Sequence, residues 1–246
     1  MTLLPEIHAS YSEKVYEKLA AKGYAVYDFF LPGLLIDALE RGNADTLAGW
    51  AQEILDKHIL TVNMLGCHDG IPMLDLKGLL PEERIQSLID LIVSRGGMVK
   101  NLHGQKNVYY QVNATYYSAL GENDAKLLMA RAIQMFMPGK PQVWYLDLFA
   151  GKNDCDAVAR AGEGGHKEIN RTNLTKVQIA EALEKQVVKK QLELLRLRRN
   201  CPAFAPGADV SIESRGHVLT IEWKHDGHTA CLQADLQKLT YHIDTV

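Results

Sequence analysis

Two hydrophobic patterns alternate along most of the chain. Short apolar runs that predict buried strands lie at residues 3–8, 24–31, 60–65 and 141–149. Apolar residues with helical spacing lie between and after them, at 11–21, 33–40, 45–57, 81–94, 123–137 and 175–199. Two helix starts carry local signals: Glu82 and Glu83 follow Pro81, and Thr175 and Gln178 have the spacing of a capping box. The remaining segments, 98–121 and 150–174, are expected to be long connections.

The pattern changes after Cys201-Pro202. Residues 209–246 alternate apolar and polar side chains, and turn residues stand near Ser214–Gly216 and Asp226–Gly227. This pattern predicts a small antiparallel β domain. We therefore place a boundary between a first domain, residues 1–202, and a second one, residues 203–246.

Alternation of strands and helices predicts parallel βαβ units. A closed (β/α)₈ TIM barrel takes about 250 residues for eight units, whereas the pattern here supplies four units. The expected fold class is α/β, with half of a barrel followed by the β domain. A complete four-stranded α/β sandwich is the alternative.

Composition is that of a globular protein. The 246 residues include 47% hydrophobic and 23% charged side chains, and 27 Lys and Arg stand against 30 Asp and Glu. These proportions exclude intrinsic disorder and, without a basic excess, argue against a nucleic-acid binder. No apolar run reaches the length of a membrane span, and no leader peptide is recognisable, so a cytoplasmic protein is expected. Four dispersed cysteines without a CxxC pair predict reduced thiols rather than a disulfide framework or a zinc site.

Polar side chains gather where the predicted strands end. They are Glu6, His8, Asp28, His68, Asp69, Asp147 and residues 152–154. Active sites of parallel α/β folds are assembled at those ends, and two carboxylates such as Glu6 and Asp69 fit glycoside chemistry. The simpler interpretation is that Glu6 is solvated, that Asp69-Gly70 is a turn, and that the tyrosines between 109 and 117 are core residues.

Several longer segments carry a resemblance to a known family. They are LLPEIHASY (3–11), YAVYDFFLPGLLIDAL (24–39), LGCHDGIPMLDLKGLLP (65–81), YYQVNATYYSALG (109–121), PGKPQVWYLDLFAGKND (138–154) and HKEINRTNLT (166–175). Together they resemble the C-terminal half of sucrose phosphorylase-like enzymes, a branch of the α-amylase superfamily (glycoside hydrolase family 13). The resemblance implies barrel strands five to eight and a retaining glycosyltransferase that moves glucose between an α-glucoside and phosphate.

The resemblance also assigns roles to residues. It implies that Glu6 is the general acid/base, that Asp69 stabilises the transition state, and that His68 and Arg171 hold the glucosyl unit. It places His8, Tyr110 and Gln111 toward the phosphate or the acceptor sugar. Inorganic phosphate is then a co-substrate, and neither a cofactor nor a metal is implied.

Two features depart from the family pattern. Val108 stands where sucrose phosphorylases typically have an aspartate, and Lys100, His103 and Lys106 in the same stretch could meet an anionic acceptor. This stretch resembles more closely the relatives that use fructose 6-phosphate, glycerate or glucosylglycerol-type acceptors. The family's nucleophilic aspartate precedes the position of Glu6, and none of Met1 to Pro5 is a carboxylate. We therefore expect a truncated member that is inactive alone.

Three functions follow from this. The first is a glycoside phosphorylase whose other half is a separate polypeptide, with a homo-oligomer as the other possible assembly. The second is a non-catalytic remnant. The third is an α-glucoside hydrolase of the same superfamily. The expected ligands are a sugar and phosphate, with no nucleic acid and no membrane.

Overall fold

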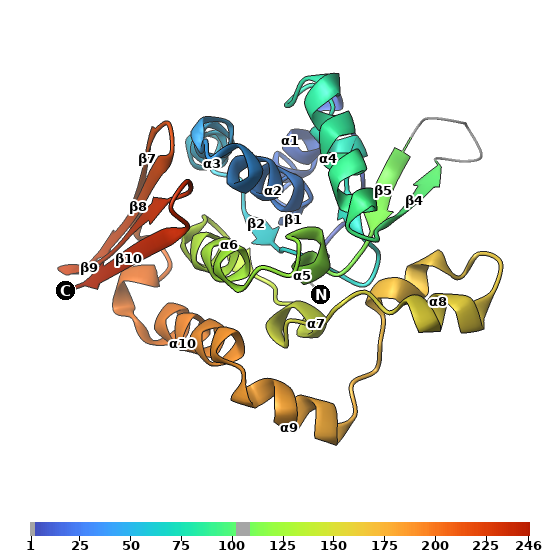
Figure 1. Ribbon diagram of the computed structural model, residues 1–246. Helices are drawn as coiled ribbons and strands as arrows, with labels where there is room; N and C mark the ends of the chain where they lie inside the picture. Colours follow the sequence, from blue (N-terminus) through green and yellow to red (C-terminus); the bar gives the residue numbers. More distant parts are fainter. Residues whose placement is uncertain (1–2, 102–108) are drawn as a thin grey trace.

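The computed structural model describes residues 3–101 and 109–246. Figure 1 shows a helical body with a four-stranded sheet at one end and α8 (Cys155–Ala161) at the other. Within the described residues, no helix is long and apolar enough to cross a membrane.

A small parallel sheet lies at the centre of the helical body. Its order is β1 (Val26–Asp28), β2 (Thr61–Asn63) and β6 (Lys140–Pro141). Asp28 and Asn63 are fully buried on the face that packs against helices, where Trp50 donates to Asp28 and Asn63 donates to the carbonyl of Pro138. Tyr27 and Val62, on the opposite face, are only half-buried. One face of this sheet is therefore covered, and the other, which carries Tyr27 and Val62 and which we call the inner face, is partly open.

Five helices confirm the predicted apolar periodicity. They are α1 (Val15–Ala20), α2 (Leu31–Arg41), α3 (Asp45–Asp56), α4 (Glu82–Ser94) and α6 (Asp124–Phe136). Helices α3 and α4 bury one side, whereas α2 and most of α6 are buried all round, and the buried apolar side chains of all five helices belong to one hydrophobic core.

Two of the predicted strands are wrong. Residues 3–10 form no strand, and Pro5 lacks the N–H that a ladder needs. The run 141–149 contributes only its start to β6, after which α7 (Tyr145–Leu148) follows. A short apolar run fits a buried helical turn as well as a buried strand, and periodicity does not separate them.

The connection predicted over 98–121 contains regular structure. It forms β4 (Met98–Asn101), β5 (Tyr109–Asn113) and α5 (Tyr116–Ala119), and β5 pairs antiparallel with both β4 and β3 (Ile71–Pro72). Val112 is fully buried and pairs with Ile71 on one side and Val99 on the other. A polar, aromatic stretch thus contains two paired strands, β4 and β5, and β5 also pairs with β3, which precedes α4 in the chain.

The helix predicted over 175–199 is two helices, α9 (Lys176–Glu184) and α10 (Gln186–Asn200). The chain is extended at Lys185, where ψ is 135°, and neither glycine nor proline marks the break. The capping box of Thr175 and Gln178 is confirmed at the start of α9.

The antiparallel sheet near the C-terminus is confirmed. It is a meander of β7 (Asp209–Arg215), β8 (Val218–His225), β9 (His228–Asp235) and β10 (Thr240–Thr245). Trp223 anchors it to α6 by donating to the carbonyl of Phe136 over 2.7 Å. The core is continuous across residue 202, so the sheet is packed onto the helical body. The domain boundary itself stays a prediction.

Candidate functional site

Three of the candidate side chains converge beyond the carboxyl end of β2. A carboxylate oxygen of Glu6, a ring nitrogen of His68 and a carboxylate oxygen of Asp69 all lie within 4.8 Å of one another. His68 and Asp69 stand in the loop that follows β2, whereas Glu6 comes from the extended N-terminal segment. Glu6 and His68 are exposed and Asp69 is half-buried. We call these three residues the Glu6 cluster.

Two cations hold Asp69 in its ionised form. Lys167 Nζ lies 2.7 Å from Asp69 Oδ1, and Arg171 Nη2 lies 3.2 Å from the same oxygen. Burial on its own would raise the pKa of Asp69, but Lys167, His68 and Arg171 together hold that pKa below its ordinary value. The carboxylate is therefore negative at neutral pH, as a group that stabilises a positive centre must be.

The loop that carries the cluster is held in place by the 3₁₀ helix Gly165–Asn170 and by Arg171, the residue that follows this helix. Arg171 Nε donates to the carbonyl of His68 over 2.7 Å, and Asn170 donates to the carbonyl of Cys67 over 2.8 Å. Asn113 of β5 also donates to the carbonyl of Asp69. Two segments that lie far from this loop in sequence thus fix the backbone around His68 and Asp69.

The buried carboxylate of Asp147 supports the start of the loop that carries His68 and Asp69. Asp147 is fully buried and accepts from the backbone N–H of Gly66 at 2.9 Å and of Tyr116 at 3.1 Å. Burial raises the pKa of Asp147 to about 6, and the charge of the buried Arg131 opposes that rise. A Cβ at Gly66 would lie 2.5 Å from Asp147 Oδ2, so the close approach requires glycine.

A second group surrounds His8, and we call it the His8 cluster. His8 Nδ1 lies 2.9 Å from Oδ2 of the buried Asp75. Its ring stacks on Phe29, with centroids 3.8 Å apart, and meets Tyr110 edge-on at 4.8 Å. These contacts fix the position of the imidazole on three sides.

Tyr110 links the two clusters electrostatically. Burial raises the pKa of Tyr110, and the negative charges of Asp75, Asp69 and Glu6 raise it further. Gln111, its neighbour on β5, is fully buried, and neither its amide nitrogen nor its oxygen has a hydrogen-bond partner among the described residues. A buried amide without partners is costly, so we expect the Gln111 side chain to meet a polar ligand.

The residues predicted from the sequence are placed by the structure in three different ways. Glu6, His68, Asp69 and Arg171 lie together, and His8 lies beside Tyr110. Other strand-end residues have structural tasks: Asp28 accepts from the backbone of Phe30 and Leu31, Asn153 accepts from Thr115, and Asp154 caps α8. The side chain of Lys100 and residues His103, Lys106 and Val108 lie outside the described residues.

Sequence reasoning missed three partners of these side chains: Lys167 beside Asp69, and Asp75 and Phe29 beside His8. Lys167 stands in the segment 166–175 that carries the family resemblance, four residues before Arg171, and this spacing to a candidate arginine was a usable signal. Asp75 and Phe29 carry no local signal, because their contacts with His8 depend on the fold.

Comparison with known proteins gives a consistent result. No family model matches the chain. It is 51% identical over 245 residues to the sucrose 6(F)-phosphate phosphorylase of Ilumatobacter coccineus, covering 96% of this chain and 47% of that protein. It is 35% identical to the sucrose phosphorylase of Streptococcus mutans, over 98% of this chain and 50% of the relative. The chain thus spans about half the length of the curated relatives it matches.

Solved structures agree. The crystal structure of sucrose 6F-phosphate phosphorylase from Thermoanaerobacter thermosaccharolyticum superposes with a TM-score of 0.92 at 37% identity, over 100% of this chain and 49% of that one. An α-amylase from H. orenii, at a TM-score of 0.59 and 14% identity, shares the fold. These matches place the chain in the sucrose phosphorylase-like family of the α-amylase superfamily, over the C-terminal half of those enzymes.

Proposed function

We propose that this chain supplies the acid/base half of a glycoside phosphorylase that transfers glucose between an α-glucoside and phosphate. The observation that carries the proposal is the convergence of Glu6, His68 and Asp69, with Lys167 and Arg171 paired to Asp69. In this proposal β1, β2 and β6 are strands six to eight of a (β/α)₈ barrel, and the segment around Glu6 takes the place of strand five.

The charges of the cluster suit the two steps of a retaining reaction. Glu6 is exposed, so it can donate a proton to the departing glycosidic oxygen and then accept one from the incoming phosphate. Asp69 is held ionised and stabilises the positive charge that develops at the anomeric carbon. The nucleophilic carboxylate of a retaining reaction would come from the half of the relatives that this chain does not match.

The second cluster suits the phosphate or the acceptor. His8 is fixed by Asp75, Phe29 and Tyr110, and the buried Gln111 offers an amide that lacks a protein partner within the described residues. A resident metal ion is not part of the proposal, because it would have to displace Lys167 and Arg171 from Asp69. The cytoplasmic location stays a prediction.

For the substrate we propose sucrose 6F-phosphate in preference to sucrose. Two of the similar proteins named above carry that substrate in their names. The sequence adds cations at Lys100, His103 and Lys106, which favour an anionic acceptor. The release of glucose 1-phosphate from sucrose 6F-phosphate and from sucrose, measured in parallel, tests the preference.

The activity is tested on this chain alone and on this chain co-expressed with the part of the Ilumatobacter coccineus relative that precedes the match. We expect background turnover from the chain alone and phosphate-dependent glucose 1-phosphate from the pair. Glu6→Gln and Asp69→Asn should each lower the rate about 10²-fold or more. Glu184→Gln, which changes an exposed carboxylate of α9, is the matched control.

Two results would contradict the proposal. Release of free glucose alone in abundant phosphate would identify an α-glucoside hydrolase. A stable pair without any turnover would identify a non-catalytic remnant.

A further inference from the structure

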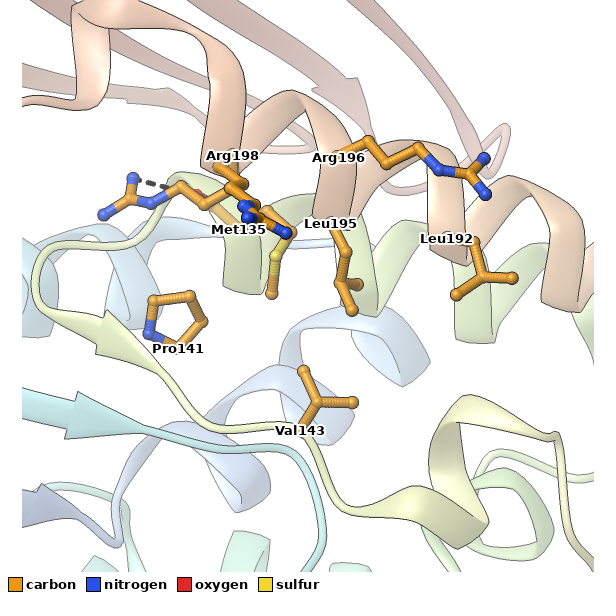
Figure 2. A pocket seen from close by; sticks show the side chains of 8 residues that line it. Met135, Pro141, Val143, Leu192, Leu195, Arg196 and Arg198 are labelled. Carbon is orange, nitrogen blue, oxygen red and sulfur yellow. Dashed lines mark hydrogen bonds between the residues drawn. The ribbon is translucent and has the colours of Figure 1, made fainter.

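Two hollows beside the parallel sheet differ in the groups that line them. The larger, of about 380 Å³, lies between α10 and the segment after β6, and Figure 2 shows the apolar side chains of Leu192, Leu195 and Val143 around it. The smaller, of about 20 Å³, lies between the segment that carries Glu6 and the end of β1, and Asp75 is part of its lining. Of these two hollows, as far as the described residues line them, only the second contains a carboxylate.

Asp75 makes two contacts with the segment that carries Glu6. Its Oδ2 lies 2.9 Å from Nδ1 of His8, and its Oδ1 accepts from the backbone N–H of Ala9 over 3.3 Å. Within the described part of the chain, these are the only hydrogen bonds that residues 3–9 make. Glu6 and His8 are two residues apart in an extended segment and therefore share one side of it. The carboxylate of Asp75 thus fixes where that side lies.

Asp75 itself stands in the short stretch that follows Asp69. In this stretch β3 pairs with β5, the N–H of Met73 bonds to the carbonyl of Tyr110 over 3.2 Å, and the carbonyl of Lys77 accepts from the backbone just after the Glu6 segment. The stretch therefore contacts β5 and the Glu6 segment at once. Through it, Asp75 connects the Glu6 cluster to the His8 cluster.

The contact with Asp75 leaves the other ring nitrogen of His8 available. The ring face lies on Phe29, and Tyr110 meets the ring edge-on. Nε2 of His8 has no hydrogen-bond partner among the described residues, and the side chain is 10% exposed. A carboxylate at Nδ1 selects the tautomer that carries its proton there. Nε2 then accepts from a ligand hydroxyl when the ring is neutral and donates to an anionic oxygen when the ring is protonated.

We propose that Asp75 is a positioning residue of the candidate site, which holds the Glu6 segment in place and turns Nε2 of His8 toward inorganic phosphate. This role rests on the proposed function for its ligand and deepens it, because it identifies what favours phosphate over water. In the second step of a retaining reaction, a phosphate oxygen bonds to the anomeric carbon as the bond to the nucleophilic carboxylate breaks, and Glu6 accepts the proton that the phosphate loses. Water can attack in the same way, but it needs no contact with His8.

The contact is tested on this chain alone by NMR of the ring nitrogens of His8, assigned with His8→Gln. In the neutral ring we expect the proton on Nδ1 in the parent chain and on Nε2 in Asp75→Asn, whose amide can donate to Nδ1. Asp75→Asn keeps an oxygen for the N–H of Ala9, so exchange of this amide should stay slow. Asp75→Ala should accelerate the exchange about tenfold or more.

The effect on turnover is measured with the co-expressed pair described above, as the ratio of glucose 1-phosphate to free glucose. Asp75→Asn should lower this ratio about tenfold and leave the release of free glucose nearly unchanged. Asp75→Ala should lower both products, because it also releases the Glu6 segment. Asp37→Asn is the matched control, since its carboxylate is equally buried but pairs with Arg84 between α2 and α4. It should lower the temperature of thermal unfolding and leave the ratio unchanged.

Two outcomes would overturn the role of Asp75. One is a proton on the same nitrogen of His8 in the parent chain and in Asp75→Asn. The other is a product ratio that falls no further in Asp75→Asn than in Asp37→Asn. A pair that forms but releases neither product refutes the proposed function, and the NMR signature of His8 together with the exchange of Ala9 then decides by itself whether Asp75 positions this segment.

Discussion

The two main sheets of this protein differ in how they are completed. Strands β7 to β10 follow one another in the chain, each pairs with its sequence neighbour over at least six residues, and Ile221 at its centre is fully buried. The parallel sheet has strands of two or three residues, and its pairs join Val26 to Thr61 and Val62 to Lys140.

The difference is one of sequence separation. The antiparallel sheet obtains every strand partner from the adjacent segment, so 38 residues specify it. The parallel sheet needs crossover connections, and within residues 3–101 and 109–246 its edge beyond β6 and its inner face remain partly uncovered. Residues of equal hydrophobicity should therefore contribute unequally to stability in the two sheets.

The sharpest comparison is Ile221→Ala against Val62→Ala. Ile221 is fully buried between β8 and the helical body, and its truncation should lower the free energy of unfolding by roughly 2–5 kcal/mol. Val62 is half-buried on the open inner face, and its truncation should cost less than about 1 kcal/mol. Urea denaturation of the isolated chain measures both.

The same pair of variants also tests what covers the inner face. In a complex with the remaining half of a relative, the cost of Val62→Ala should rise toward that of a core residue, while the cost of Ile221→Ala stays constant. Equal costs of the two substitutions in the isolated chain would mean that both sheets are equally complete.

The sequence predicted the parts of the fold whose signals are local. Helices α1, α2, α3, α4 and α6 and the meander of β7 to β10 follow from periodicity and turn residues within each segment. The failures at residues 3–8 and 141–149 have another cause. Whether an apolar run becomes a strand depends on a distant partner. The contact of Asp147 with the backbone N–H of Gly66, for example, exists only in the folded chain.

The candidate site shows the same division. Family resemblance gave Glu6, His68, Asp69 and Arg171, and the structure brings these side chains together. Resemblance does not give the supporting contacts. The contact between Asp75 and His8 joins two segments that are far apart in the chain, and no spacing in the sequence indicates it.

A second prediction concerns the loop that links the parallel sheet to the Glu6 cluster. Gly66→Ala would place a methyl group 2.5 Å from Asp147 Oδ2, which should cost about 1–3 kcal/mol of stability and displace His68 and Asp69. The matched control is Gly49→Ala on the exposed side of α3, where no atom lies within 4 Å of the new Cβ.

The control should raise stability by about 0.5–1 kcal/mol, because alanine favours the helix interior. Thermal unfolding measures both variants, and glucose 1-phosphate release by the two-half assembly reports on the loop. If Gly66→Ala behaved like Gly49→Ala, the loop would not depend on the contact with Asp147.

The covered face of the parallel sheet contains a titrating group. Asp28 ends β1, is almost completely buried, and accepts hydrogen bonds from the backbone of Phe30 and Leu31 and from Trp50 Nε1. Burial raises the pKa of Asp28 to about 6, although these donors oppose the rise. In the unfolded chain the pKa returns to about 3.9.

The smallest expected effect follows from this difference. Because the folded pKa is raised, the stabilisation is complete below pH about 4 and is lost as the pH rises through about 6. Between pH 5 and 7, Asp28 alone should lower the free energy of unfolding by about 1 kcal/mol. Asp28→Asn should remove this slope, whereas Asp156→Asn, at an exposed position of α8, should retain it. Urea denaturation across this range measures the difference, and identical slopes for the chain and Asp28→Asn would show that the covered face of β1 admits water to the carboxylate.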